Sequence, residues 1–240
     1  MQMRLDKFIS EGAGISRAQA RKLIIKGCVT VDGVTAKKID AQTSQEQEVK
    51  INGDSVFYEE FVYIMLNKPL GVVSASKDKN DVTVTDLVAK DFPKRELFPA
   101  GRLDKQSEGF VLITDDGKFA HDILSPKHHV PKTYIVTLDA PVTPLVIEAF
   151  EKGVELADGQ VMKSAEIKIL ENDTTAQIIL HQGVYHQIKR MLGVFDIGVN
   201  TLYRTTIGNL SMPADLASGK YIKLTKKQVE MIAPSMFTEN

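Results

Sequence analysis

The sequence predicts an α+β protein, with a mixed sheet in its larger part and a small helical module at its N-terminus. Helical patterns at 144–152 and 187–195 alternate with strand-like apolar runs, which favours helices packed on a sheet. The chain has 240 residues, 43% hydrophobic and 25% charged, enough for one or two domains with a substantial core. The apolar runs expected to be strands are 62–66, 110–114, 134–138, 167–170 and 176–180.

The first forty residues predict two helices followed by a β-hairpin. Leu5, Phe8 and Ile9 fall on one face of a helix before glycines interrupt the pattern. Residues 28–32 form a strand-like run after the second helix, and Asp32-Gly33 predicts a tight turn into another strand. The expected order is therefore helix, turn, helix and hairpin.

The second of these helices is expected to begin after Ser16 and to carry cations on its polar face. Gln19 lies three residues further on, as in a capping box, and Gly27 is placed to end the helix. Residues 1–40 contain eight Lys or Arg against four acids, although the formal charge of the whole chain is -1. This local excess is either a solvated helix face or a docking surface for phosphates.

A polar and acidic stretch separates this module from the rest of the chain. It runs from 42 to 60 and includes Asn52-Gly53, a second hairpin signal. We expect one domain over 1–58, a linker over 59–61 and a second domain over 62–240. In the second domain a strand leads into Asn67-Lys68-Pro69, a helix is expected at about 118–124, and residues 74–99 carry no clear pattern.

The stretch 101–117, GRLDKQSEGFVLITDDG, places one carboxylate in a polar loop just before an apolar run. Asp104 is a candidate nucleophile or base, because a strand would fix its position while the loop leaves it reachable. Arg102 beside it offers a planar cation suited to a phosphate or a stacked base. An Arg-Leu-Asp turn alone is more often only a turn. Asp115-Asp116-Gly117 is expected to be a turn and helix cap without a catalytic role.

The same stretch resembles the signature of pseudouridine synthases, in particular the RsuA-type branch that acts on ribosomal small-subunit RNA. Ser107 stands where that family more usually has Thr, and its hydroxyl can still cap the loop. Other segments similar to the family are NKPLG at 67–71, KTYIV at 132–136 and GVYHQIKRM at 183–191. The resemblance implies a curved, mainly antiparallel mixed sheet with a central RNA-binding cleft.

The N-terminal module resembles the S4 RNA-binding domain over residues 4–33, RLDKFISEGAGISRAQARKLIIKGCVTVDG. This order of elements favours RNA binding over a solvated face for its cations. Recognition of RNA shape and phosphates should dominate such binding. The residues expected to contact RNA are Arg4, Arg17, Arg21, Lys22 and Lys26.

The resemblance implies an enzyme that flips a uridine out of RNA, breaks its N1–C1' bond, turns the uracil and joins C5 to C1'. Asp104 is implied as the catalytic carboxylate, which either attacks C1' or removes a proton at C2'. Tyr134 is implied to pack on the target base, and Lys189 to pair with Asp104. Arg102 is implied to fill the space that the base leaves, and Arg190 to contact RNA or the protein itself.

The expected substrate is one uridine of 16S rRNA, in an assembling small ribosomal subunit. SPKHH at 125–129 resembles the small-subunit enzymes more than their large-subunit relatives, and a 23S rRNA uridine is the runner-up. A noncatalytic S4-type assembly protein is a third interpretation, but it would not need the segments around Asp104, Tyr134 and Lys189. A glycosidase is disfavoured, since it needs two carboxylates and only Asp104 has a convincing setting.

Several other classes are disfavoured by missing motifs. Cys28 is the single cysteine, which excludes an internal disulfide or a thiolate zinc cage within one chain. No metal-site spacing accompanies His128-His129, and the family is expected to work without metal or organic cofactor. Nucleotide-binding loops and GxSxG elbows do not occur. The N-terminus is unlike a signal peptide, no membrane-spanning run occurs, and we expect a cytoplasmic monomer.

Overall fold

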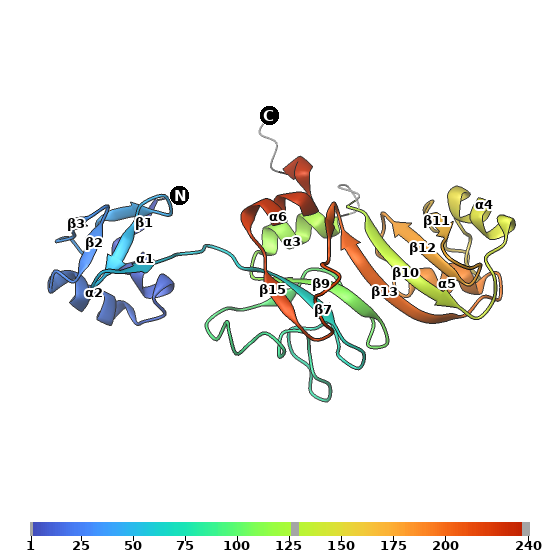
Figure 1. The fold of residues 1–240 in the computed structure, drawn as a ribbon, viewed down its shortest axis with the longest axis horizontal. Helices are drawn as coiled ribbons and strands as arrows, with labels where there is room; N and C mark the ends of the chain where they lie inside the picture. Colours follow the sequence, from blue (N-terminus) through green and yellow to red (C-terminus); the bar gives the residue numbers. More distant parts are fainter. Residues whose placement is uncertain (1, 126–129, 237–240) are drawn as a thin grey trace. The chain divides into compact units, whose positions relative to one another are not determined.

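The computed structural model describes residues 2–125 and 130–236 (Figure 1). The chain divides into two compact units, Met1–Phe61 and Val62–Asn240. Each unit has hydrophobic core clusters of its own. Among the described residues, no helix combines the length and apolar character needed to cross a membrane.

The first unit combines two helices with two small sheets. One sheet pairs β1 with β4 antiparallel, and the other has the order β3-β2-β5-β6. Its elements are β1 (Gln2–Arg4), α1 (Leu5–Gly12), α2 (Arg17–Ile25), β2 (Val29–Val31), β3 (Val34–Thr35), β4 (Gln42–Ser44), β5 (Val49–Ile51) and β6 (Asp54–Val56).

Local sequence signals account for most of this unit. Leu5, Phe8 and Ile9 are all buried on one face of α1, as the apolar spacing predicts. The capping box before α2 is confirmed: the Gln19 N–H donates to the Ser16 hydroxyl at 3.2 Å, and the Ser16 N–H donates to Gln19 Oε1 at 2.9 Å. These contacts are short-range in sequence, which is why the pattern predicts them.

The second unit is built on a nine-stranded mixed sheet with the main order β11-β12-β10-β13-β9-β7-β15. β13 and β9 run parallel and the other pairs are antiparallel, so the predicted mainly antiparallel mixed sheet is confirmed. The strands are β7 (Tyr63–Lys68), β8 (Phe98–Pro99), β9 (Glu108–Thr114), β10 (Lys132–Leu138), β11 (Glu166–Ile169), β12 (Thr175–Leu180), β13 (Val199–Ile207), β14 (Leu210–Ser211) and β15 (Tyr221–Lys223).

The parallel junction between β9 and β13 joins the two halves of this sheet. It consists of two residue pairs, Tyr203 with Glu108 and Arg204 with Gly109. Gly109 has φ +102°, and a Cβ at this position would lie 2.3 Å from the Arg204 carbonyl oxygen. A glycine is therefore required for the strands to meet.

β7 and β9 are buried on both faces, because two different cores pack against them. Met65 and Leu112 pack with α3 and α6, which lie close together in Figure 1. Leu66 and Val111 belong to the other core, which includes residues of α4 and α5. The helices of this unit are α3 (Gly117–Leu124), α4 (Pro144–Lys152), α5 (Gln187–Gly193), α6 (Lys226–Ile232) and the 3₁₀ turn Pro234–Met236.

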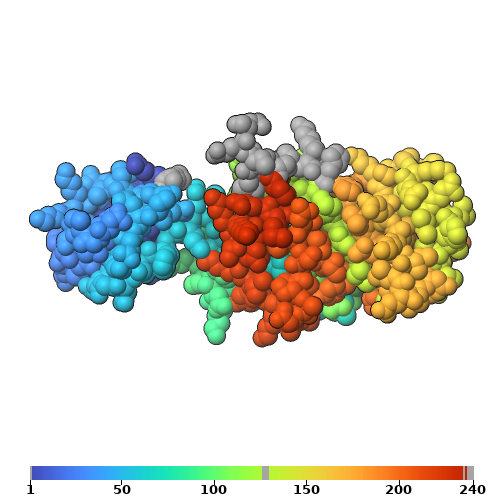
Figure 2. Space-filling model, turned by 45° about the horizontal axis from the view of Figure 1, so that its top comes forward, coloured from blue at the N-terminus to red at the C-terminus, as the bar shows by residue number. Residues whose placement is uncertain are grey.

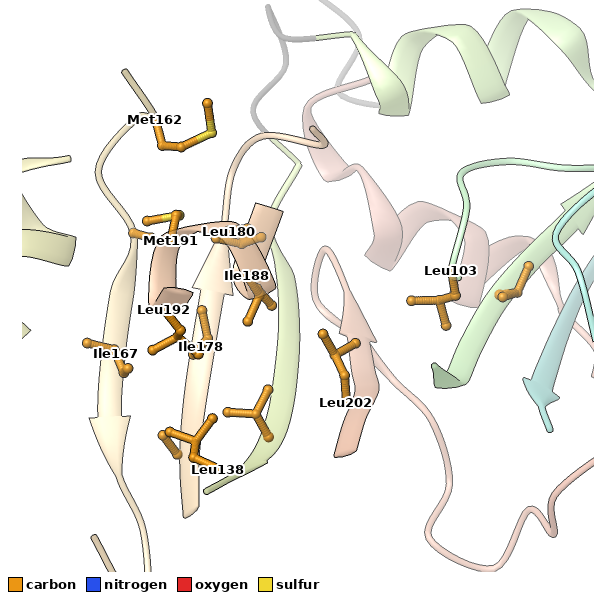
Figure 3. Close-up of a cluster of buried hydrophobic side chains, with 14 of the residues drawn as sticks. Leu103, Leu138, Met162, Ile167, Ile178, Leu180, Ile188, Met191, Leu192 and Leu202 are labelled. Carbon is orange, nitrogen blue, oxygen red and sulfur yellow. The ribbon is translucent and has the colours of Figure 1, made fainter. Parts of the chain in front are cut away.

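Figure 3 shows how α5 is seated in this second core. Ile188, Met191 and Leu192 project from α5 toward strand residues that include Ile178 on β12. On the face seen in Figure 2, the C-terminal part of the chain (red) and residues 140–180 (yellow to orange) lie toward different ends of this unit. The strand order agrees, since β15 and β11 form the two edges of the sheet.

Three features differ from the sequence pattern or lie beyond it. β13 and α6 are not predicted from their residues, although β13 lies in the middle of the sheet. The helix expected at 187–195 ends at Gly193. Residues 74–99, which carry no clear pattern, are largely irregular and contribute Val84, Val88 and Leu97 to the core.

Candidate active site

Asp104 lies in the loop between β8 and β9, and backbone hydrogen bonds hold this loop in place. The Ser107 N–H donates to the Asp104 carbonyl at 3.0 Å, and the Gly71 N–H donates to the Lys105 carbonyl at 2.9 Å. The Asp104 side chain is 34% exposed. The carboxylate is therefore fixed by its backbone but reachable by a ligand.

A second anchor holds the residue before Asp104. The Leu103 side chain is buried, its N–H donates to the Ser74 hydroxyl at 3.0 Å, and that hydroxyl donates to the Leu103 carbonyl at 2.8 Å. The expected capping role of the Ser107 hydroxyl is wrong: this oxygen is buried and has no hydrogen-bond partner among the described residues. The Ser107 backbone N–H closes the turn instead.

Lys68, in the NKPLG segment, ties its own strand to this loop. Its side chain is fully buried, and Nζ donates to the Ser107 carbonyl at 2.7 Å and the Pro69 carbonyl at 2.9 Å. Burial lowers the pKa of Lys68 from 10.5 to about 8, although the charges of Glu108 and Asp104 act in the opposite direction. The sequence motif is thus explained as a support for the Asp104 loop.

A cavity of about 540 Å³ opens beside Asp104, where the two halves of the sheet meet. Arg102, Asp104, Tyr134 and Lys189 all line it, so the structure brings these four predicted site residues together. Among the described residues, no hydrogen bond or ion pair engages the Arg102 or Lys189 side chain. The apolar part of the wall includes Leu103, Ile123, Leu180, Ile188, Leu202 and Ile207.

Two further cations in the cavity wall are absent from the sequence prediction. Arg204 is 3% exposed, donates from Nε to the Phe110 carbonyl at 2.7 Å and lies 5.9 Å from the centre of the Tyr134 ring. Lys132 donates to the Val130 carbonyl at 2.7 Å, and burial lowers its pKa to about 8. Arg204 belongs to β13. Because the sequence pattern does not predict this strand, it gives no reason to place Arg204 at the site.

The partner of Asp104 is His186, whereas the sequence prediction names Lys189. His186 Nε2 lies 3.2 Å from Asp104 Oδ2, and no ion pair joins Lys189 to Asp104 among the described residues. His186 has the left-handed backbone angles φ 50° and ψ 32°, just before α5 begins. Its ring stacks on Tyr185, with ring centres 3.8 Å apart and planes 17° apart.

Arg190, on the same helix, is occupied by a contact within the protein. Its Nη2 forms an ion pair with the Asp158 carboxylate, and its Nη1 donates to Gln160 Oε1 at 3.3 Å. Arg190 is not among the residues that line the cavity.

Asp116 is the N-cap of α3, where it accepts from the Phe119 N–H at 2.9 Å, so its predicted capping role is confirmed.

In the first unit, Arg4 and Arg21 are held by the buried carboxylate of Asp6. Arg4 Nε lies 3.1 Å from Asp6 Oδ1, and Arg21 Nε lies 2.9 Å from Oδ2. Burial acts to raise the pKa of Asp6, but the two guanidinium groups outweigh it and hold this pKa below its ordinary value. Both arginines line a shallow groove with Lys37 and Lys38. Arg17, Lys22 and Lys26 are exposed and lie outside this groove.

Residues 126–129 of SPKHH lie outside the described residues, so the specificity argument drawn from them stays a prediction. Within the described part of the chain, no group of three or more His, Cys, Asp or Glu side chains is arranged to hold a metal ion.

The structure combines a nine-stranded mixed sheet, an anchored aspartate in the cavity wall and a separate helix and hairpin unit. The chain belongs to the RNA pseudouridylate synthase family, whose model matches residues 62–193, and it is a pseudouridine synthase. Residues 3–41 match the S4 domain. The predicted family, fold and enzyme class are confirmed.

Relatives with assigned names cover almost the entire chain. A Bacillus subtilis protein described as an uncharacterized RNA pseudouridine synthase is 40% identical over 234 residues, covering 96% of this chain and 98% of the relative. Ribosomal small subunit pseudouridine synthase A of Escherichia coli K12 is 38% identical over 232 residues, covering 96% and 100%. A crystal structure of a pseudouridylate synthase is 38% identical with a TM-score of 0.68, covering 96% of this chain and 99% of that one.

Proposed function

We propose that this enzyme isomerises one uridine of 16S rRNA to pseudouridine, with Asp104 as the essential carboxylate. The observation that supports this most is the convergence of Asp104, Tyr134, Lys189 and Arg102 on one cavity. These residues come from the loop before β9, from β10 and from α5, which are distant in sequence. A noncatalytic RNA-binding protein has no need for such a convergence.

The cavity suits a single flipped nucleotide. Its volume of about 540 Å³ lies within the range of small-ligand sites in proteins. Extrusion of a uridine costs a few kcal/mol of unstacking, and Arg102 is an exposed cation at the cavity that can occupy the vacated space. The apolar side chains of Leu103, Ile188 and Leu202 would exclude water and keep a detached uracil from escaping.

The reaction exchanges one bond for another without a net gain or loss of atoms. The N1–C1' bond breaks, the uracil turns, C5 bonds to C1', and the C5 proton is exchanged for one on N1. Asp104 either attacks C1' or removes a proton from C2', and both routes require an ionised carboxylate. Tyr134 packs on the uracil from the cavity wall, while Lys189 supplies an unpaired positive charge for the reacting groups or their phosphates.

The substrate assignment to 16S rRNA is supported by the names of relatives. Proteins that match 96% of this chain at 38% and 39% identity are ribosomal small subunit pseudouridine synthases of Escherichia coli and Haemophilus influenzae. We further propose that the enzyme acts in the cytoplasm as a monomer, on an assembling small subunit, without metal or organic cofactor. The S4 domain would bind rRNA through Arg4, Arg17, Arg21, Lys22 and Lys26, and Arg190 would be an additional RNA contact on α5.

Pseudouridine mapping of rRNA tests this proposal directly. We expect one site in 16S rRNA to be missing in cells without the gene and restored by the wild-type gene, but not by Asp104→Asn. A missing site in 23S rRNA would keep the chemistry and change the substrate. Restoration by Asp104→Asn would refute the role of the carboxylate, and a complete set of sites without the gene would refute the proposed activity.

A further inference from the structure

Tyr185 is an exposed aromatic side chain at the mouth of the candidate active site. It lines the same cavity as Asp104, yet it is 72% exposed. The other large hydrophobic side chains that are exposed in the described part of the second unit are aliphatic, whereas Tyr185 is aromatic. A tyrosine ring is planar and largely apolar with a polar hydroxyl, so one exposed at the mouth of this cavity can stack on a planar ligand.

The structure holds this ring ready for stacking. His186 covers one face of Tyr185, with ring centres 3.8 Å apart, and its Nε2 contacts Asp104 at 3.2 Å. The left-handed backbone of His186, φ 50°, is uncommon for a residue other than glycine. The exposure of Tyr185 leaves its remaining surface open to a second planar group.

Tyr185 and Tyr134 are suited to different bases. Tyr134 is half-buried on β10 with the Arg204 guanidinium 5.9 Å from its ring centre, so it belongs to the enclosed part of the cavity. A base that lay on the far more exposed Tyr185 would remain outside that part. Arg102 and Lys189 form no ion pair within the described part of the chain, line the same cavity and suit the phosphates that connect two such nucleotides.

We infer that Tyr185 is a stacking platform for the base next to the target uridine, and that His186 orders its ring. The inference rests on the proposed function of the Asp104 cavity and adds a second nucleotide subsite to it. Stacking of this kind tolerates all four bases, because each has a planar face. The subsite would therefore contribute affinity and register more than sequence choice.

The test uses the full-length enzyme carrying Asp104→Asn, so that RNA binds without turnover, and an RNA fragment around the uridine found by mapping. 2-Aminopurine replaces the base before or after that uridine, since stacking on an aromatic ring quenches its fluorescence. We expect quenching at one of the two positions. Tyr185→Phe should retain it, whereas Tyr185→Ala should abolish it and weaken binding about tenfold.

An RNA that lacks the flanking base provides the second arm. Removal of the base should weaken binding about tenfold when Tyr185 is present, but should hardly affect binding to Tyr185→Ala. The base and the ring form one contact, so the effects of removing each do not add. His186→Asn keeps a residue that tolerates the left-handed backbone and removes the imidazole stack. It should reduce the quenching without abolishing it.

Several results would overturn the inference. The first is unchanged quenching in Tyr185→Ala. The second is an equal loss of quenching and affinity in Tyr185→Phe and Tyr185→Ala. The third is that removal of the base and removal of the ring weaken RNA binding additively. Because the RNA comes from the mapped site, a 23S substrate leaves this test intact. If mapping finds no site at all, the proposed function fails first, and that failure is seen without any Tyr185 variant.

Discussion

Asp104 combines a rigid backbone with a side chain that a ligand can reach. The Lys68 ammonium, the Ser74 hydroxyl and the Gly71 N–H all bond to backbone atoms of its loop. Each of these contacts comes from a segment some thirty residues earlier in the chain. These contacts hold the backbone of Asp104 in place, as the proposed attack or proton removal would require.

The Asp104→Asn variant tests the catalytic role of this residue. Loss of the carboxylate should reduce kcat by about 10³-fold or more, while RNA affinity and Tm stay close to wild type. Turnover of a mapped rRNA fragment under saturating enzyme measures the effect. Asp173→Asn, an exposed carboxylate of the same unit outside the cavity, is the matched control. A normal rate in Asp104→Asn would contradict the assignment.

Lys132 gives the folded protein a measurable dependence on pH. Burial and the positive charge of Arg204 lower its pKa from 10.5 to about 8. Between these values the unfolded chain binds more protons than the folded one, so the free energy of unfolding rises with pH in this window. Below pH 8 both states are protonated and the contribution is constant.

We therefore compare the wild type with Lys132→Met, which cannot titrate. Between pH 7.5 and pH 9.5 the free energy of unfolding of the wild type should gain roughly 1–2 kcal/mol relative to the variant. Urea unfolding at the two pH values provides the measurement. The same difference at both values would show that Lys132 titrates normally.

At the scale of elements, the short parallel junction of β9 and β13 creates the site. Arg204 and Gly109 pair there, and the cavity is lined by residues of β10 and β13 on one side and by the loop before β9 on the other. β13 also pairs with β10, which carries Tyr134. One strand thus positions the Asp104 loop relative to the aromatic residue proposed to pack on the base.

The Gly109→Ala variant should disrupt this junction. The added Cβ would lie 2.3 Å from the Arg204 carbonyl oxygen at a φ of +102°, so the strands must separate. We expect a loss of about 2 kcal/mol or more in the free energy of unfolding, with reduced turnover. Gly117→Ala is the control, since no atom lies within 4 Å of its added Cβ. Equal thermal stability of the two variants would argue against the requirement for glycine.

At the scale of the whole molecule, we propose that the S4 domain adds RNA contacts to those made around the Asp104 cavity. The cations of the S4 domain are not equivalent, because Arg4 and Arg21 are tied to the buried Asp6 carboxylate. Their removal would leave that charge without a partner and destabilise the domain. Arg17 and Lys22 are exposed, and among the described residues neither forms an ion pair.

Arg17→Ala combined with Lys22→Ala should therefore weaken RNA binding without changing kcat at saturating RNA. With two fewer phosphate contacts, the slope of log affinity against log salt concentration should become less steep by about two units. The loss of affinity should be largest at low salt. Lys226→Ala with Lys227→Ala removes the same charge from exposed positions on α6. Equal losses in both pairs would show a general charge effect, with no special role for the S4 surface.

The accuracy of the sequence prediction depends on how far apart the interacting residues lie. The capping box at Ser16 and the apolar face of α1 involve residues within a few positions of each other, and both are confirmed. β13 escapes prediction because its partners Glu108 and Lys132 lie about seventy to ninety-five residues away. The roles of Asp104, Tyr134 and Lys189 stay predictions, although the structure places all three around one cavity.

By itself, the sequence determined the enzyme family, the S4 domain and the candidate carboxylate, since these depend on short contiguous segments. Only the tertiary structure decided that Lys68 supports the Asp104 loop, that Arg204 and Lys132 join the cavity wall, and that His186 contacts the carboxylate. Burial and pairing of charges arise from segments that meet only in the folded chain. A local sequence pattern therefore does not predict these contacts between distant segments.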